Sequence, residues 1–273
     1  MNEPSAFMQM YANVMVFFLG ACWGSFLNVC IYRIPEELSV VKPRSRCPVC
    51  LKMIAWYDNI PMLSWLLLRG RCRACKTGIS PRYFLVELLT AVLFLLVWLR
   101  YGFAAVTPIY WLMVFGLVLA TFIDFDHFII PDRVSIGGML LGPVLSVLAP
   151  SLHGEEAWWP ALLASLIGLA AGYGSLRVVG IVGTWLFKKD AMGLGDVKLL
   201  GALGAFLGWQ AVIFVILVSS LLGSVVGIGL IVSGRGQWSG RIPYGPYIAL
   251  AAVIWALGGD AWWAWYAAWV TGQ

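Results

Sequence analysis

Long apolar stretches recur along this chain, and they constrain its fold more than any other feature. The first extends from about residue 11 to residue 31, and about 20 apolar residues suffice to cross a bilayer as one helix. Hydrophobic residues make up 61% of the chain and charged residues 11%, against roughly 45–50% and 25% in soluble domains. Because hydrocarbon offers no water to unpaired backbone groups, stretches of this length fold as helices. We therefore predict an all-α polytopic membrane protein.

The apolar stretches divide the chain into about eight transmembrane helices. We place them at about residues 11–31, 84–99, 106–123, 134–148, 160–187, 196–207 and 211–232, with a last one after residue 247. Three regions follow from this division: a first transmembrane helix (1–32), an inserted polar loop (33–83) and a transmembrane core (84–273). The first apolar stretch has no cleavage pattern of a signal peptide, so we expect it to be retained.

The polar loop sets the orientation of the chain in the membrane. Residues 33–82 contain ten of the eighteen Lys and Arg residues and only three acids. Basic loops stay on the cytoplasmic side, which places both termini outside. The net charge of +5 is therefore a topology signal, and we expect a bilayer rather than nucleic acid as the partner of this surface.

Two C-x2-C pairs lie inside the polar loop, with 21 residues between them. Each pair can aim two thiolates at one ion, and two pairs complete a tetrahedral four-thiolate site. Disulfides are a poorer explanation in a reducing, cytosolic loop. The sequence thus predicts a structural zinc ion, with no coordination position left for water, bound by Cys47, Cys50, Cys72 and Cys75.

Two acids occupy matching places at the cytosolic ends of predicted spans. Asp124 directly follows the third span, and Asp196 follows Gly193 and Gly195 at the start of a helix. Capping or interfacial anchoring would explain either acid alone, and for Asp132 we expect the helix-capping role. At equal depth, however, the carboxylates of Asp124 and Asp196 can meet and share a proton. Such a pair can hydrolyse a peptide by general acid–base catalysis.

Polar residues inside the other apolar stretches allow two interpretations. Ser25 and Asn28 share a face of the first span, which either forms a small-residue packing seam or places Asn28 in the lining of a ligand cavity. Glu87, near the cytosolic end of the second span, either pairs with a loop arginine or faces the active cavity. The role of Arg177 in the fifth span stays open.

Taken together, these motifs resemble the type IV prepilin leader peptidase family, whose members cleave and N-methylate prepilins and type II secretion pseudopilins. A lone G-x-G-D would be weak evidence, because presenilin-type intramembrane proteases share it. Here the matching pieces occur in family order and cover nearly the whole chain: residues 24–29 with Arg33 and Pro35, the two C-x2-C pairs, Asn59-Ile60-Pro61, residues 123–127 with Pro131 and Asp132, residues 193–199, and residues 242–247. One departure is Phe84, where the family commonly has a proline after Tyr83.

The resemblance implies that Asp124 and Asp196 are the catalytic aspartates. It also implies an enzyme of the bacterial inner membrane that cuts prepilin and pseudopilin leaders on the cytosolic side, after a glycine. The new N-terminal amine would then be methylated with S-adenosylmethionine. No Rossmann-type glycine fingerprint is present, so Asn28 and Arg33 are only candidate donor-binding residues. Contact with the pilus or secretion assembly platform stays open.

Three alternatives remain at this point. A peptidase without methyltransferase activity is one, although the intact C-x2-C pairs argue against it. A transporter that moves protons or cations with its paired acids is the second, and a non-catalytic assembly scaffold is the third.

Overall fold

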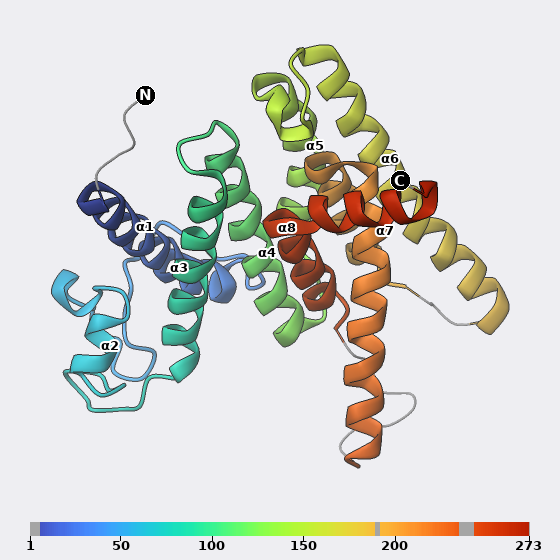
Figure 1. The fold of residues 1–273 in the computed structure, drawn as a ribbon. Helices are drawn as coiled ribbons and strands as arrows, with labels where there is room; N and C mark the ends of the chain where they lie inside the picture. The colour runs from blue at the N-terminus through green and yellow to red at the C-terminus, as the bar shows by residue number, and fades with distance from the viewer. Residues whose placement is uncertain (1–5, 189–191, 235–242, 273) are drawn as a thin grey trace. The chain divides into compact units, whose positions relative to one another are not determined.

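The computed structural model describes residues 6–188, 192–234 and 243–272. It separates into two units, Met1–Thr107 and Pro108–Gln273 (Figure 1). The described residues form helices and contain no strand, only two isolated β-bridges. The predicted all-α class is therefore confirmed. Ile242, the first residue of the last sequence motif, lies outside the described residues.

The first unit is built on two long helices, α1 (Ala6–Arg33) and α3 (Pro81–Tyr101), which pack against each other. Gly20 and Gly24 bring the two backbones together: a Cβ on Gly24 would lie 2.7 Å from the Cα of Glu87. A third contact is polar, because the indole N–H of Trp98 donates to Asn13 Oδ1 at 3.0 Å. Gly20 and Gly24 therefore form a packing seam between α1 and α3.

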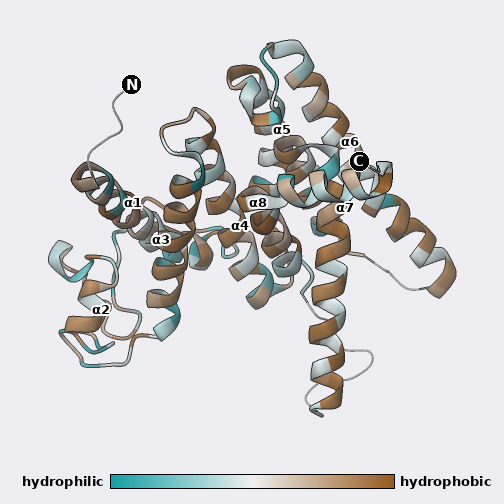
Figure 2. Ribbon diagram, in the orientation of Figure 1, coloured by the Kyte–Doolittle hydropathy of each residue, from teal (hydrophilic) through white to brown (hydrophobic). Residues whose placement is uncertain are grey.

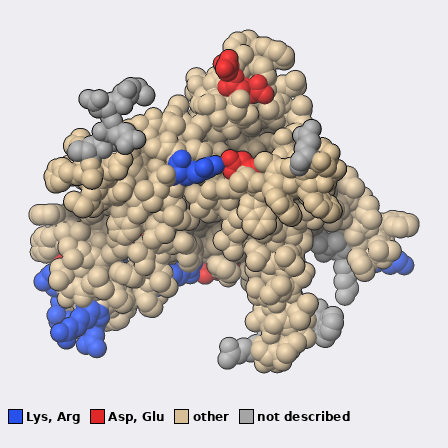
Figure 3. Space-filling model, viewed as in Figure 1, with Lys and Arg blue, Asp and Glu red and all other residues tan. Residues whose placement is uncertain are grey.

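The segment between these helices carries only short elements, η1 (Trp56–Asp58) and α2 (Leu63–Leu67). Its hydrophilic residues contrast with the apolar long helices (Figure 2), and Lys and Arg side chains gather over it (Figure 3). The inserted polar loop is thus a compact region of turns rather than a further helix.

The second unit comprises α4 (Val106–His127), α5 (Asp132–Leu148), η2 (Pro150–His153), α6 (Trp158–Phe187), α7 (Leu194–Val232) and α8 (Gly245–Thr271). Helix α7 is central, because α5, α6 and α8 all pack against it. Helices α6 and α7 approach closely where Gly168 faces the backbone of Gly204, and Gly172 faces that of Leu200. In addition, the Ser165 hydroxyl donates to the Ala205 carbonyl at 2.7 Å.

Six described helices are long and apolar enough to cross a membrane, namely α1, α3, α4, α6, α7 and α8. The chain is therefore a multi-pass membrane protein. The predicted count of about eight differs for two reasons. The fourth predicted span, α5, has only 17 residues, a rise of about 26 Å. The sixth and seventh predicted spans are counted once because they lie in one 39-residue element, α7, in which two helices meet at a kink at Gly208 with φ 82°, between the predicted ends of the two spans.

Candidate functional site

Asp124 lies in the last turn of α4 with only 5% of its surface exposed. The backbone N–H of Gly245, the first residue of α8, donates to Asp124 Oδ2 at 3.0 Å. A Cβ on Gly245 would lie 2.7 Å from the same oxygen. The missing side chain therefore lets the start of α8 fix the orientation of a buried carboxylate.

Asp196 lies in the first turn of α7, where the helix dipole favours an anion. Gly193 precedes this helix, and a Cβ there would come within 2.9 Å of Asp196 Oδ2. Any larger residue at position 193 would therefore clash with the Asp196 carboxylate. The G-x-G-D sequence thus places an acid at the tip of a helix without a side chain at position 193 that crowds it.

The structure brings Asp124 and Asp196 into one site. The two carboxylates interact electrostatically, and the side chain of Ile130 lies between their supporting glycines. A Cβ on Gly195 would approach Ile130 Cβ to 3.1 Å, and one on Gly245 would approach Ile130 Cδ1 to 3.2 Å. Ile130 therefore packs against a glycine beside each acid, and two carboxylates that interact electrostatically can perform general acid–base chemistry.

The surroundings of this pair correct one prediction. Asp132 does not cap α5, because the N-cap residue is Pro131 and no side chain caps the helix. Instead, Lys198 donates to Asp132 Oδ1 at 2.7 Å. This bond ties the first turn of α5 to the first turn of α7, next to Asp196. Sequence spacing could not reveal it, since 66 residues separate the two partners.

The four loop cysteines form a second cluster. Their Sγ atoms lie within 4.8 Å of one another, and those of Cys47 and Cys75 are 3.7 Å apart. Thiolates around a tetrahedral zinc ion, each at about 2.3 Å, are separated by about 3.8 Å. The donor set and its spacing therefore fit zinc.

Each C-x2-C pair is shaped by the same backbone turn. The N–H of Cys47 donates to Lys52 and that of Cys72 donates to Thr77, at 3.0 and 2.9 Å. Within the first turn, the backbone N–H groups of Cys50 and Val49 lower the pKa of the Cys47 thiol to about 6. Amide groups that stabilise a thiolate in this way prepare it to bind a metal.

An ion pair links the second cysteine turn to η1. Arg73 donates to both carboxylate oxygens of Asp58, with distances of 2.6 to 2.9 Å, and these bonds lower the pKa of Asp58. The Arg73 guanidinium also lies 5.7 Å from the centre of the Tyr57 ring. The second cysteine turn and η1 are therefore held together by this ion pair.

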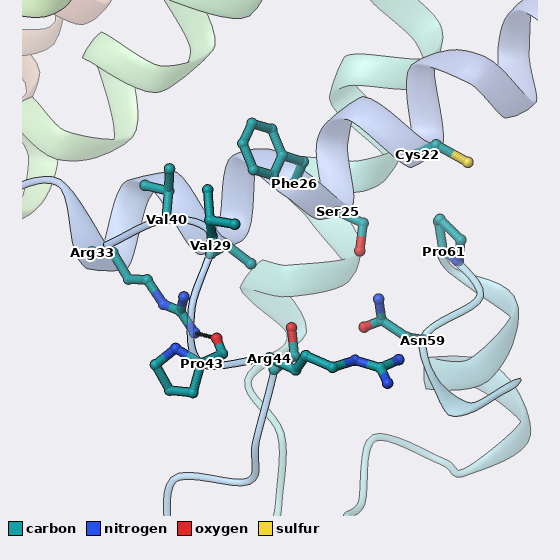
Figure 4. Close-up of a pocket in the computed structure, with 12 residues that line it drawn as sticks. Cys22, Ser25, Phe26, Val29, Arg33, Val40, Pro43, Arg44, Asn59 and Pro61 are labelled. Atoms are coloured by element: carbon teal, nitrogen blue, oxygen red, sulfur yellow. Dashed lines mark hydrogen bonds between the residues drawn. The ribbon is translucent and has the colours of Figure 1, made fainter. Parts of the chain in front are cut away.

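A cavity of about 310 Å³ opens beside α1 in the same unit (Figure 4). Arg33 is one of its lining residues, whereas Asn28 is not. The Asn28 amide instead donates to the Tyr83 carbonyl at 3.0 Å. The two candidate donor-binding residues thus have different surroundings, and of the two only Arg33 lines this cavity.

Glu87 has partners that neither sequence interpretation named. Its Oε2 accepts the backbone N–H of Met62 at 2.7 Å, and it also accepts a hydrogen bond from the Ser25 hydroxyl. Met62 has a positive φ of 58°, which is uncommon for a residue other than glycine. Glu87 therefore fastens the segment before α2 to α1 and α3.

Two family models match this chain: a bacterial peptidase A24 N-terminal domain over residues 18–101 and the type IV leader peptidase family over residues 111–228. A prepilin leader peptidase/N-methyltransferase of Myxococcus xanthus is 46% identical over 233 residues, which cover 85% of this chain and 67% of that protein. A protein of the same name from Aeromonas hydrophila is 40% identical over 280 residues, with 92% of each chain covered. The chain belongs to the type IV leader peptidase family.

Further relatives and the matched ranges agree with this membership. A prepilin leader peptidase/N-methyltransferase of Neisseria gonorrhoeae is 35% identical over 277 residues, with 93% of each chain covered. The N-terminal match contains the four cysteines and Arg33, and the leader peptidase match contains Asp124 and Asp196. No solved structure matches the chain.

Proposed function

We propose that this leader peptidase family member removes the leader of type IV prepilins and type II secretion pseudopilins and then N-methylates the new terminus. The relatives that share most of its length carry both activities in their names. The observation that supports the peptidase most directly is the pairing of Asp124 with Asp196, braced by the N–H of Gly245.

Hydrolysis requires one ionised and one protonated carboxylate. The ionised member takes a proton from a water molecule, whose oxygen attacks the carbon of the scissile carbonyl. The protonated member donates its hydrogen bond to the carbonyl oxygen and stabilises the charge that develops there. When the C–N bond breaks, the amine leaves with the proton taken from water. Asp124 and Asp196 therefore act together as the acid and base, without a covalent intermediate.

The protein around the pair has two tasks. The N–H of Gly245 orients Asp124 and Ile130 packs against Gly195 and Gly245, whereas Gly193 has no side chain to clash with Asp196 Oδ2 and would leave room there for the substrate backbone. Both acids lie at helix ends; Asp124 is buried and Asp196 is partly exposed. The basic polar loop puts this side in the cytosol.

Cys47, Cys50, Cys72 and Cys75 would hold a structural zinc ion. A zinc ion bound by four thiolates has no open coordination position, so it would stabilise the loop and take no part in hydrolysis. S-adenosylmethionine would supply the methyl group, and the N-terminal unit is the part that would bind it. Pilins and pseudopilins are the proposed protein partners, and the assembly platform is a further proposed contact.

A synthetic prepilin tests both activities at once. The full-length protein in nanodiscs, supplied with S-adenosylmethionine, should release the leader and yield a mature peptide with one added methyl group on its N-terminal amine. Mass spectrometry identifies both products. A mature peptide without the methyl group would leave only the peptidase, and an uncut prepilin together with ion flux would favour the transporter.

A further inference from the structure

The cavity beside α1 has one wall made by a single face of that helix. Cys22, Ser25, Phe26, Val29 and Arg33 line it, at the three- and four-residue spacing of neighbouring side chains on a helix. This wall is apolar towards its middle and ends in a cation. The Ser25 side chain points into the space between the walls (Figure 4).

The opposite wall comes from two loop segments, residues 40–45 and 59–61. Arg33 holds the first segment in place, because its guanidinium donates to the carbonyls of Ser39 and Pro43, both at 2.8 Å. These acceptors are neutral, so the positive charge of Arg33 stays beside the cavity. The Arg44 side chain extends along the cavity towards the Asn59 amide (Figure 4).

The second loop segment is held by the buried Glu87. Its bonds to the N–H of Met62 and the hydroxyl of Ser25 tie the residues next to Pro61 to α1. A carboxylate with 8% exposure thus fixes the loop segment that carries Asn59, while Arg33 and Arg44 line other parts of the cavity. The cavity is therefore a built feature, with walls fixed by named hydrogen bonds, rather than a gap between loose loops.

We propose that this cavity is the binding site for S-adenosylmethionine, an inference that rests on the proposed methyltransferase activity. The methyl donor combines a carboxylate, a purine and a cationic sulfonium. Arg33 and Arg44 suit the carboxylate, the Asn59 amide suits the donor and acceptor edge of the purine, and Phe26 and Val29 suit its ring. A volume of about 310 Å³ lies at the lower end of the range of small-molecule sites, roughly 300–1,000 Å³.

Direct binding measurements on the full-length protein test the site. We would measure the affinity for S-adenosylmethionine by calorimetry in nanodiscs of neutral lipid, so that anionic headgroups do not compete for the arginines. Arg44→Gln should weaken binding by about tenfold or more, because it removes a charge-assisted hydrogen bond. Asn59→Ala should weaken it to a smaller extent. Lys42→Gln removes the same charge from the same loop but not from the lining, and it should bind like the wild type.

Zinc content and thermal midpoint verify that each variant is folded. Wild-type affinity in both folded Arg44→Gln and Asn59→Ala would overturn the proposed site, even though the enzyme methylates. A different result would overturn the methyltransferase activity itself, and the site with it: a wild-type protein that cuts prepilin but binds no S-adenosylmethionine.

Discussion

Gly245 offers a sharp test of how the proposed catalytic pair, Asp124 and Asp196, is held. A methyl group at this position would lie 2.7 Å from Asp124 Oδ2, well inside contact distance, so the carboxylate must rotate or the start of α8 must move. Either shift breaks the 3.0 Å hydrogen bond from the Gly245 N–H. The backbone itself tolerates alanine, because Gly245 does not have a positive φ.

The size of the effect follows from the bond that is lost. A hydrogen bond to a charged group contributes roughly 1.5–3 kcal/mol, and each 1.36 kcal/mol is tenfold in rate. If the bond is needed to orient Asp124 in the transition state, Gly245→Ala should lower the kcat of leader cleavage roughly 10- to 150-fold. KM for the prepilin should change little, since the substrate contacts remain.

The assay is cleavage of a synthetic prepilin by the detergent-solubilised enzyme, followed on gels over time. Gly174→Ala is the matched control, because a Cβ on this α6 glycine meets nothing within 4 Å. The control should cleave at the wild-type rate. A folded Gly245→Ala protein that also cleaves at that rate would refute the claim that this N–H positions Asp124.

Three further predictions concern the zinc cluster, Glu87 and His153. Cys72→Ser should lower bound zinc and the thermal midpoint, since structural zinc contributes on the order of 10 kcal/mol to folding; unchanged metal content by mass spectrometry would contradict the four-thiolate site. Glu87→Ala should lower the free energy of unfolding by roughly 1–3 kcal/mol, because it leaves the N–H of Met62 unpaired, and should weaken S-adenosylmethionine binding, whereas Glu87→Gln keeps an acceptor oxygen. A Glu87→Ala protein with the thermal midpoint and affinity of the wild type would argue against a role of Glu87 in fixing the cavity wall. Burial lowers the pKa of His153 below its ordinary 6.5, so just below pH 6.5 His153 binds a proton in the unfolded chain but not in the folded one. Stability should therefore fall as the pH drops below about 6.5. His153→Gln should flatten this dependence of the thermal midpoint on pH.

The membrane class and the four-cysteine cluster could be predicted from the sequence, because their signals are local. Apolar length identifies a spanning helix, and paired cysteines at fixed spacing identify a metal site. The break between the sixth and seventh predicted spans could also be predicted, since two helices of α7 meet at Gly208, between residues 207 and 211. The count of spans was harder to predict, because the fourth predicted span forms a helix of only 17 residues, α5.

Partners far apart in the chain escaped prediction for a different reason. The bond from Gly245 to Asp124 spans 121 residues, and that from Met62 to Glu87 spans 25. Both use a backbone N–H, which every residue except proline carries and which therefore leaves no mark in the sequence. Glu87 accordingly suggested an arginine partner, and Asp132 suggested a cap. In each position the side-chain chemistry was clear but the tertiary partner was not.

The most direct test of the proposed hydrolysis is the cleavage rate of Asp124→Asn and Asp196→Asn, each purified with normal zinc content. An amide can neither take the proton from water nor give one to the carbonyl, so each substitution should reduce leader cleavage by at least about 10²–10⁴-fold. Asp126→Asn, two residues beyond Asp124, serves as the control and should stay near the wild-type rate. Substantial cleavage by either Asp124→Asn or Asp196→Asn would contradict a mechanism that depends on both acids.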